Sequence, residues 1–243
     1  MIILRSLLFN FAFYFWTAFL GLAALPLALA PRRWTMGFGT WWSGTVLWLA
    51  RAIAGIDYEL RGSEHLPAGS SIIAMKHQSA WDTLATPVLF RDPAIVAKRE
   101  LFWIPFYGWY VSRAGMIPVD RGAGAMALRK MVQHALRAVA LQRPIVIFPE
   151  GTRTAVGAQR AYLPGIAALY SRLEIPVVPV ALNSGLFWSR RSFLKHPGKI
   201  VVEVLPPIPP GWERRRFLAE LQERIETATR RLVAEANRER TFP

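Results

Sequence analysis

The sequence lacks cysteine altogether among its 243 residues. Disulfides, thiolate-bound metal ions and cysteine nucleophiles are therefore excluded, and a secreted scaffold held by disulfides is not expected. Acidic residues are also few, since 16 Asp and Glu stand against 30 Lys and Arg, and the net charge of +14 predicts anionic partners. The four histidines show no recognisable metal-ligand spacing with carboxylates, so we expect no metal ion.

The chain is rich in apolar and aromatic residues. Hydrophobic residues make up 53% of it and include 10 Trp and 14 Phe, a composition that is unusual for a soluble nucleic-acid binder and typical of a protein at a lipid surface. We therefore expect membrane phospholipids rather than nucleic acid as the anionic partner. A nucleic-acid binder remains an alternative, although the sequence contains no recognised zinc-finger, helix-turn-helix or RNA-binding signature.

The first fifty residues differ from the rest. Residues 6–30 contain no Asp, Glu, Lys, Arg or His, and a helix of these 25 residues exceeds the hydrocarbon thickness of a bilayer, about 30 Å. Pro26 and Pro31 mark a break, after which residues 34–50 form a second uncharged stretch with four Trp. Because Trp prefers the headgroup level, we interpret this stretch as interfacial and predict that residues 1–52 form a two-helix membrane anchor. The alternatives are a single spanning helix, a cleaved signal peptide and an ordinary buried helix pair.

After residue 52 the pattern changes to short apolar runs separated by longer amphipathic stretches, and residues 53–243 are predicted to form one catalytic domain. The predicted strands cover residues 58–61, 71–75, 94–97, 145–148, 177–182 and 200–205. The predicted helices cover residues 81–90, 104–113, 124–141, 165–173 and 212–237. This alternation predicts an α/β fold with a central mixed, partly parallel sheet flanked by helices, and places the active site in loops at one edge of the sheet.

The run Lys-His-Gln-Ser-Ala-Trp-Asp, residues 76–82, follows a predicted strand and opens a predicted helix. A turn at this place can bring the carboxylate of Asp82 beside the imidazole of His77, where it accepts from one ring nitrogen and leaves the other free as a base. An Asp at this offset from a His also occurs by chance, so the place of the pair between strand and helix carries more weight than its spacing.

Two further runs stand at the ends of predicted strands. Residues 148–153 read Phe-Pro-Glu-Gly-Thr-Arg, in which Gly151 permits a tight backbone approach and Arg153 offers a guanidinium fork suited to a phosphate. Residues 114–121 form a small-residue strand that ends in an Asp-Arg pair. Taken singly, the first run is also consistent with an edge turn carrying a solvated Arg, and the second with a surface salt bridge.

Together these runs resemble the signature boxes of the glycerophospholipid acyltransferase family, and in particular those of its bacterial 1-acylglycerol-3-phosphate acyltransferases. The H-x4-D box corresponds to His77 and Asp82, and the Phe-Pro-Glu-Gly-Thr-Arg box is matched without change. The second box, which ends in Arg, corresponds to residues 115–121, and a Val-Pro-Val strand corresponds to residues 178–180. The resemblance covers roughly residues 58–205.

The resemblance implies a reaction and a set of roles. It implies transfer of a fatty acyl group from acyl-CoA or acyl carrier protein to the sn-2 hydroxyl of lysophosphatidic acid, with no cofactor. By this resemblance His77 is the general base and Asp82 its orienting partner, since an alcohol is a poor nucleophile until a base removes its proton. The implied substrate-binding residues are Arg153, Arg121 and Lys98 for the phosphate, and Glu150, Gly151 and Thr152 for the acceptor site.

Two details qualify the resemblance. Lys76 departs from the family pattern, because the family often has Asn before the histidine. Donors for the oxyanion are not specified by any box, although the backbone amides of residues 79–81 at the helix start are candidates.

The anchor and the bacterial resemblance together imply a location at the cytoplasmic side of the bacterial inner membrane. The alternatives within the same family are enzymes that acylate lyso-ornithine lipid or lysophosphatidylglycerol. An alternative of another class is a non-catalytic membrane-binding protein in which the boxes serve folding.

Overall fold

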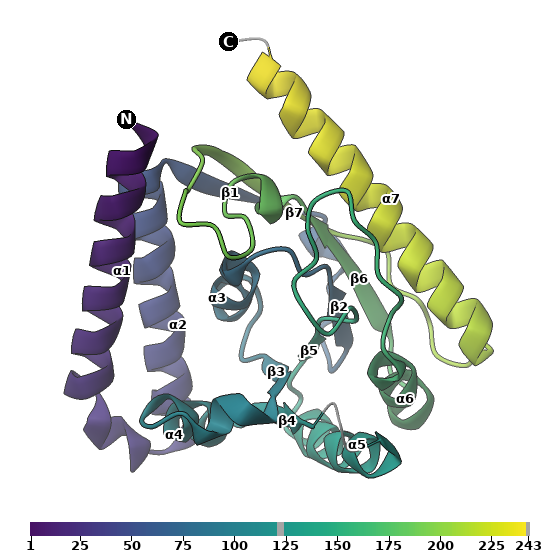
Figure 1. The fold of residues 1–243 in the computed structure, drawn as a ribbon. Coiled ribbons are helices and arrows are strands. Elements are labelled where there is room, and N and C mark those ends of the chain that lie inside the picture. The colour runs from purple at the N-terminus through teal and green to yellow at the C-terminus, as the bar shows by residue number, and fades with distance from the viewer. Residues whose placement is uncertain (121–123, 242–243) are drawn as a thin grey trace.

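The computed structural model describes residues 1–120 and 124–241, and Arg121 lies outside this part of the chain. A central sheet carries helices on both faces and is preceded by two long helices (Figure 1). The helices are α1 (Ile2–Ala23), α2 (Arg32–Leu49), α3 (Ala80–Leu89), α4 (Tyr107–Arg113), α5 (Gly124–Ala140), α6 (Pro164–Leu173) and α7 (Arg214–Thr241). The strands are β1 (Ile56–Arg61), β2 (Ile72–Met75), β3 (Ala94–Lys98), β4 (Ile117–Val119), β5 (Ile145–Ile147), β6 (Val177–Leu182) and β7 (Gly198–Val204).

The helices α1 and α2 lie side by side, run in opposite directions and occupy the side of the molecule that faces away from α7 (Figure 1). The break predicted between them is confirmed, because Pro26 lies in the short 3-10 helix η1 (Leu25–Ala28) and Pro31 directly precedes α2. Among the described residues, α1 is the one helix long and apolar enough to cross a membrane, and only 17% of its most apolar 18 residues are buried. These properties are consistent with membrane association.

The helix pair also packs against the rest of the chain. Phe9 of α1 and Leu47 of α2 are buried in the same apolar cluster as Trp81 and Ala85 of α3. The ring of Phe9 meets the ring of Trp188 edge-on, with 5.1 Å between the ring centroids. The pair therefore shares a hydrophobic core with the sheet.

The seven strands stand in the order β1-β7-β6-β2-β5-β3-β4. Neighbouring strands are parallel except β6 and β7, which are antiparallel. The predicted central mixed, partly parallel sheet flanked by helices is therefore confirmed. All residues of β2, β5 and β6 are buried, as expected for strands covered on both faces.

Alternate residues of β2 face opposite layers, because side chains in a strand alternate with a period of two. Ile72 lies in the apolar cluster that contains residues of α5, α6 and α7, whereas Ile73 lies in the cluster that contains residues of α1, α2 and α3. The last helix contributes Phe217, Leu221 and Ile225 to the first of these clusters. The sheet is thus the middle layer of three.

Most predicted elements differ from the observed ones by one to four residues at an end, and two of these differences have a clear local cause. The helix predicted over residues 104–113 begins at Tyr107, because Pro105 disfavours helical geometry in the residue before it and Phe106 takes a positive φ of 62°. The strand predicted over residues 145–148 ends at Ile147, since Pro149 has no N–H with which to continue a ladder. Both differences lie close to the functional edge of the sheet.

Strands β2, β3, β5 and β6 are parallel and therefore end at the same edge of the sheet. The segments that follow them begin at Lys76, Arg99, Phe148 and Asn183. Loops at the carboxyl ends of parallel strands form the usual binding edge of an open α/β sheet. The histidine run and the Phe-Pro-Glu-Gly-Thr-Arg run consequently meet at one place.

Candidate active site

His77 and Asp82 form the predicted pair. His77 lies in the loop between β2 and α3, and its Nδ1 is 2.9 Å from Asp82 Oδ2. Ser79 is the N-cap of α3, and its Oγ accepts a hydrogen bond from the backbone N–H of Trp81 at 3.1 Å. Asp82, at the third position of the helix, in turn accepts from the backbone N–H of Ser79 at 2.8 Å. This reciprocal capping box explains the spacing of the motif, because it turns the Asp82 carboxylate back toward the loop that carries the histidine.

The Asp82 carboxylate is fully buried and saturated with donors. Besides the ring of His77 and the amide of Ser79, it accepts from the backbone N–H of Gln78 at 2.7 Å and from the hydroxyl of Ser184 at 2.5 Å. These contacts hold the carboxylate in one orientation, so the proton of a neutral His77 ring resides on Nδ1. The remaining ring nitrogen, Nε2, is then the atom available as a base.

Ser184 was not identified from the sequence. It lies in a short 3-10 helix, η5 (Ser184–Leu186), that follows β6, and it is 102 residues from Asp82 along the chain. The one signal in the sequence is its place after the Val-Pro-Val strand, where the Asn-Ser pair at residues 183–184 interrupts an apolar run.

The Phe-Pro-Glu-Gly-Thr-Arg run surrounds the histidine. The ring of Phe148 stacks on the imidazole of His77 with 4.1 Å between centroids and an angle of 24° between the planes. Glu150 Oε2 accepts from the backbone N–H of His77 at 2.8 Å, and the backbone N–H of Thr154 donates to the carbonyl of His77 at 2.7 Å. The side chain of His77 is only 14% exposed as a result. The run and the residue that follows it therefore position His77 through three contacts.

Two of the backbone amides at the start of α3 that are candidate oxyanion donors already donate hydrogen bonds within the protein. The amide of Ser79 donates to Asp82, and the amide of Trp81 donates to the Ser79 hydroxyl. The sequence suggested the backbone amides of residues 79–81 as oxyanion donors, and those of Ser79 and Trp81 are therefore excluded.

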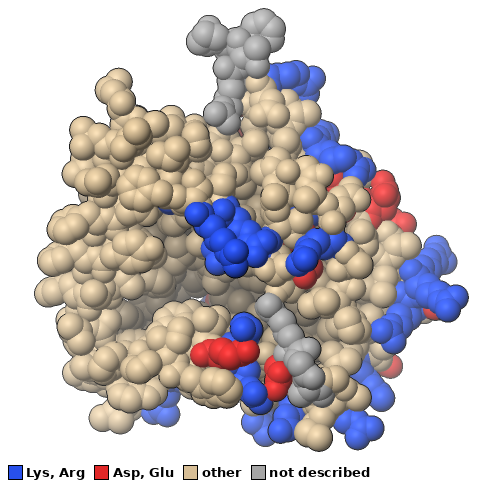
Figure 2. All heavy atoms as spheres, viewed as in Figure 1, with Lys and Arg blue, Asp and Glu red and all other residues tan. Residues whose placement is uncertain are grey.

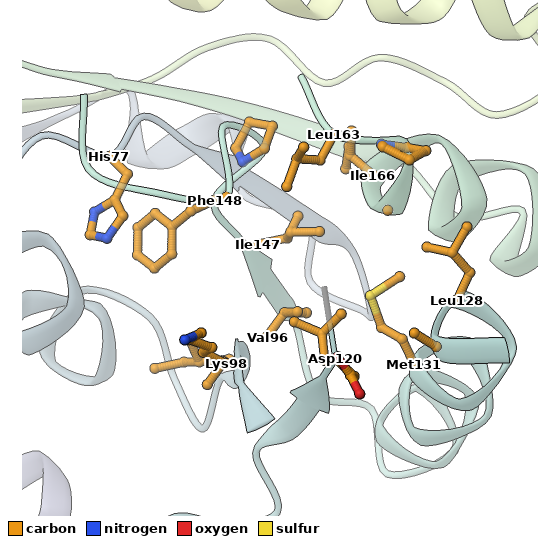
Figure 3. A pocket seen from close by; sticks show the side chains of 18 of the residues that line it. His77, Val96, Lys98, Asp120, Leu128, Met131, Ile147, Phe148, Leu163 and Ile166 are labelled. Carbon is orange, nitrogen blue, oxygen red and sulfur yellow. The ribbon is translucent and has the colours of Figure 1, made fainter. Parts of the chain in front are cut away.

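An apolar cavity of about 260 Å³ begins at His77. His77 and Phe148 stand at one end of it, and Leu128 and Met131 of α5 stand at the other (Figure 3). Between them the wall is formed mainly by aliphatic side chains, including Val96, Leu101, Ile147, Leu163 and Ile166. Such a lining suits a hydrocarbon chain whose reacting end lies beside the imidazole.

The predicted phosphate-binding residues lie in different settings. Lys98 lines the cavity, and its ammonium group is 3.0 Å from Glu100. Arg153 is half-buried and forms no ion pair within the described residues, and its neighbour Thr154 is hydrogen-bonded to the carbonyl of His77. Figure 2 shows a hollow on this face of the molecule with basic side chains on opposite sides of it. The face is suited to an anionic ligand.

The remaining predicted residues are placed as follows. Gly151 lines the cavity and has a φ of +66°, a conformation that glycine adopts without strain. Thr152, which follows it, is half-buried. Glu150 is buried behind the histidine loop, where it bonds to the backbone of His77. The sequence did not predict that Glu150 bonds directly to the backbone of His77.

The family follows from these boxes and their surroundings. The sequence model described as Acyltransferase matches residues 57–183, which contain the histidine, its aspartate and the Phe-Pro-Glu-Gly-Thr-Arg run. The chain belongs to the acyltransferase family. It is 36% identical over 194 residues to the 1-acyl-sn-glycerol-3-phosphate acyltransferase of Pseudomonas aeruginosa, and the alignment covers 80% of this chain and 76% of that protein.

Two further comparisons agree with this acyltransferase assignment. The chain is 30% identical over 205 residues to the mouse 1-acyl-sn-glycerol-3-phosphate acyltransferase alpha, covering 82% of this chain and 71% of the mouse protein. The crystal structure of the 1-acyl-sn-glycerophosphate (LPA) acyltransferase PlsC from Thermotoga maritima superposes with a TM-score of 0.78 at 21% identity, over 96% of this chain and 98% of the other. The latter likeness shows that the fold is shared.

This acyltransferase has a buried ionic cluster next to the histidine. Lys76 Nζ lies 2.7 Å from Glu150 Oε1 and 2.6 Å from Glu226 Oε1, and the lysine side chain is 1% exposed. The hydroxyl of Tyr162 donates to Glu226 at 3.4 Å. Burial, reinforced by the carboxylates of Glu226 and Glu150, raises the pKa of Tyr162 well above its usual range, so its hydroxyl keeps its proton.

These contacts explain the presence of a lysine at position 76. Glu226 belongs to α7, beyond the segment matched by the family model, and Lys76 links it to Glu150 and so to the backbone of His77. The sequence predicted a helix over residues 212–237 and no role for it at the site. Lys76 therefore connects the last helix to the loop that carries His77.

Proposed function

We propose that this acyltransferase is a 1-acyl-sn-glycerol-3-phosphate O-acyltransferase, which transfers a fatty acyl group from acyl-CoA or acyl carrier protein to the sn-2 hydroxyl of lysophosphatidic acid. The observation that carries the proposal is the His77–Asp82 pair, with 2.9 Å between Nδ1 and Oδ2, at the end of an apolar cavity. The printed names of the relatives from Pseudomonas aeruginosa and mouse support this acceptor.

In the proposed reaction His77 acts as a general base. Its Nε2 takes the proton of the acceptor hydroxyl while the hydroxyl oxygen attacks the carbonyl carbon of the thioester. The tetrahedral intermediate collapses with cleavage of the C–S bond, and the imidazolium returns its proton to the departing thiolate. Asp82 stabilises the imidazolium in between and keeps the ring in the tautomer that the first step needs. No covalent acyl-enzyme is formed.

The phosphate of the acceptor is proposed to bind to Arg153, with Lys98 and Arg121 contributing further positive charge. Support comes from Arg153, whose guanidinium has no carboxylate partner among the residues that the structure describes, and from its place one residue before the contact with His77. A guanidinium binds phosphate oxygens in a bidentate manner, which fixes the distance between phosphate and hydroxyl. Gly151 and Thr152 are proposed to form the nearby wall, and Glu150 to act through the backbone of His77.

Residues 1–52 are proposed to anchor the enzyme, and residues 53–243 to carry catalysis. The exposed apolar surface of α1 supports this proposal, because nine large hydrophobic residues of that helix face outward, namely Ile3, Leu4, Leu7, Leu8, Phe11, Tyr14, Phe15, Phe19 and Leu22. An enzyme held at the bilayer reaches a lysophospholipid without extracting its acyl chain into water. We propose the cytoplasmic side of the bacterial inner membrane as its location.

The proposal is tested with purified protein in detergent, a panel of lysolipids and both donor types. Acylation of lysophosphatidic acid is expected, and His77→Ala is expected to abolish it while leaving the fold intact by circular dichroism. Refusal of lysophosphatidic acid together with use of lyso-ornithine lipid or lysophosphatidylglycerol would transfer the assignment to that acceptor. Full activity of His77→Ala would remove the histidine from the mechanism.

A further inference from the structure

The segment between β3 and β4 exposes an unusual amount of apolar surface. It consists of a 3-10 helix, η4 (Arg99–Trp103), a turn, and α4. Five large side chains of the segment are each between 40% and 65% exposed, namely Trp103, Ile104, Phe106, Tyr107 and Trp109. Isolated apolar residues on a surface are ordinary, whereas five within seven positions form a patch that indicates a binding surface.

This patch adjoins the N-terminal helix pair. The hydroxyl of Tyr110 donates to the carbonyl of Gly21 at 3.0 Å, and the guanidinium of Arg113 donates to the carbonyls of Ala30 and Leu29 at 2.9 and 3.1 Å. In Figure 1, α4 accordingly lies beside the end of the pair where α1 connects to α2. The fold therefore holds residues 99–113 next to the end of α1 and the connection to α2.

The chemistry of the patch fits a lipid surface better than a protein partner. Residues 101–111 contain no charged side chain, whereas a protein interface intersperses polar groups that form hydrogen bonds. Three basic residues flank the run, Lys98 and Arg99 before it and Arg113 after it. Lys98 and Arg99, both about half-exposed, pair with Glu100 at 3.0 Å and with Asp120 at 2.8 Å. Trp at the headgroup level with basic residues at its edges is the usual composition of a membrane-interface segment.

The backbone of the segment is also compatible with a poorly hydrated setting. The amides of Tyr107, Gly108, Trp109 and Tyr110 all donate to carbonyls within the segment, at 2.7 to 3.2 Å. Because unsatisfied amides are costly away from water, an exposed loop without these bonds would not enter the interface.

We propose that residues 99–113 dock into the headgroup and upper acyl region of an anionic phospholipid bilayer, as a second contact besides α1. Lys98, directly before this segment, and Leu101, within it, line the cavity that begins at His77. Docking therefore places the cavity beside the lipid from which the acceptor comes, and this consequence rests on the proposed lysophospholipid acceptor. The segment fixes the orientation of the active site, which one helix alone leaves free to rotate.

The absence of cysteine permits a direct test, since a single introduced thiol can be labelled without background. We would label Ile104→Cys, Leu8→Cys of α1 and Glu223→Cys of α7 with nitrobenzoxadiazole in the full chain. Glu223 is exposed, and its helix α7 lies on the side of the molecule away from α1 (Figure 1). The proteins are reconstituted into vesicles of phosphatidylethanolamine and phosphatidylglycerol, with and without lipids that carry a nitroxide on the acyl chain.

The proposal expects blue-shifted emission and nitroxide quenching at positions 8 and 104, and neither at position 223. Quenching at position 8 without quenching at 104 would overturn the docking of residues 99–113. The proposed reaction is judged separately, by acylation of lysophosphatidic acid by the same proteins in detergent. Equal quenching at all three positions would likewise overturn the proposal, because it would indicate nonspecific association.

A functional comparison uses two matched aliphatic residues. Ile104→Gln is expected to raise the KM for lysophosphatidic acid embedded in vesicles about tenfold, while leaving kcat for a short-chain acceptor below its micellar concentration unchanged. Leu141→Gln, at an exposed site just after α5, is the control and is expected to change neither value. An equal effect of the two variants on the KM in vesicles would count against the proposed surface.

Discussion

Replacing Lys76 by Met tests the buried ionic cluster. Lys76 lies within 2.7 Å of Glu150 and Glu226, and all three side chains are at most 5% exposed. The substitution conserves most of the volume but leaves two buried carboxylates without their cation. Removal of one partner from a buried ion pair costs about 3–5 kcal/mol, which for a chain of this size lowers the melting temperature by roughly 10 °C.

The same variant is expected to lose activity through the histidine. Glu150 accepts a hydrogen bond from the backbone N–H of His77, so repulsion between Glu150 and Glu226 displaces His77, the proposed general base. We expect kcat to fall more than KM changes, because binding of the lysophospholipid does not use Lys76. The assay combines thermal unfolding in detergent, followed by circular dichroism, with initial rates over a range of acceptor concentrations.

Two controls make this prediction decisive. Lys199 pairs with Glu59 at 3.4 Å on the surface, and Lys199→Met is expected to change stability by less than about 1 kcal/mol. The double variant Lys76→Met with Glu226→Gln removes one uncompensated charge and is expected to recover part of the lost stability. Equal melting temperatures for Lys76→Met and Lys199→Met would refute the stabilising role of the cluster.

Two further predictions concern the Asp82 carboxylate and the cavity. Ser184→Ala removes the hydroxyl donor to Asp82 Oδ1 and should cost about 1–3 kcal/mol of stability, with a lower kcat, in the same two assays; an unchanged kcat would show that this bond is not needed for catalysis. Gly165→Leu should shift the preferred acyl donor to shorter chains, measured with a series of acyl-CoA lengths, because a Cβ at this position already lies 3.5 Å from Met131 Cε and a longer side chain enters the cavity.

The part of the site that sequence predicted is the part formed by neighbours along the chain. His77 and Asp82 are five residues apart, and the capping box that joins them uses residues of one turn. The geometry of a capping box is set by residues that are close in the sequence, so the sequence alone can predict it. The alternation of apolar runs likewise predicted the layers, because burial on both faces of a strand leaves a pattern within the strand itself.

The part that sequence could not predict depends on distant partners. Glu226 is 150 residues from Lys76, and a charged residue on a long helix is ordinarily a solvated one. Only the packing of α7 against β6 brings the two together. The helix predicted from residue 104 failed for a local reason, the turn at Pro105 and Phe106, whose positive φ no apolar periodicity reveals. Arg121 was predicted as a phosphate ligand and lies outside the described residues.

Asp82 both contacts the imidazole of His77 and caps α3, and these two roles limit what a substitution of Asp82 can show. One of its oxygens accepts from the imidazole and from two backbone amides at the same time. Asp82→Ala would therefore unwind the start of α3 along with releasing the ring, and an inactive protein would not distinguish a chemical defect from a misfolded loop. An inactive yet folded enzyme, useful for trapping a lipid complex, is better made at His77, whose side chain caps no helix.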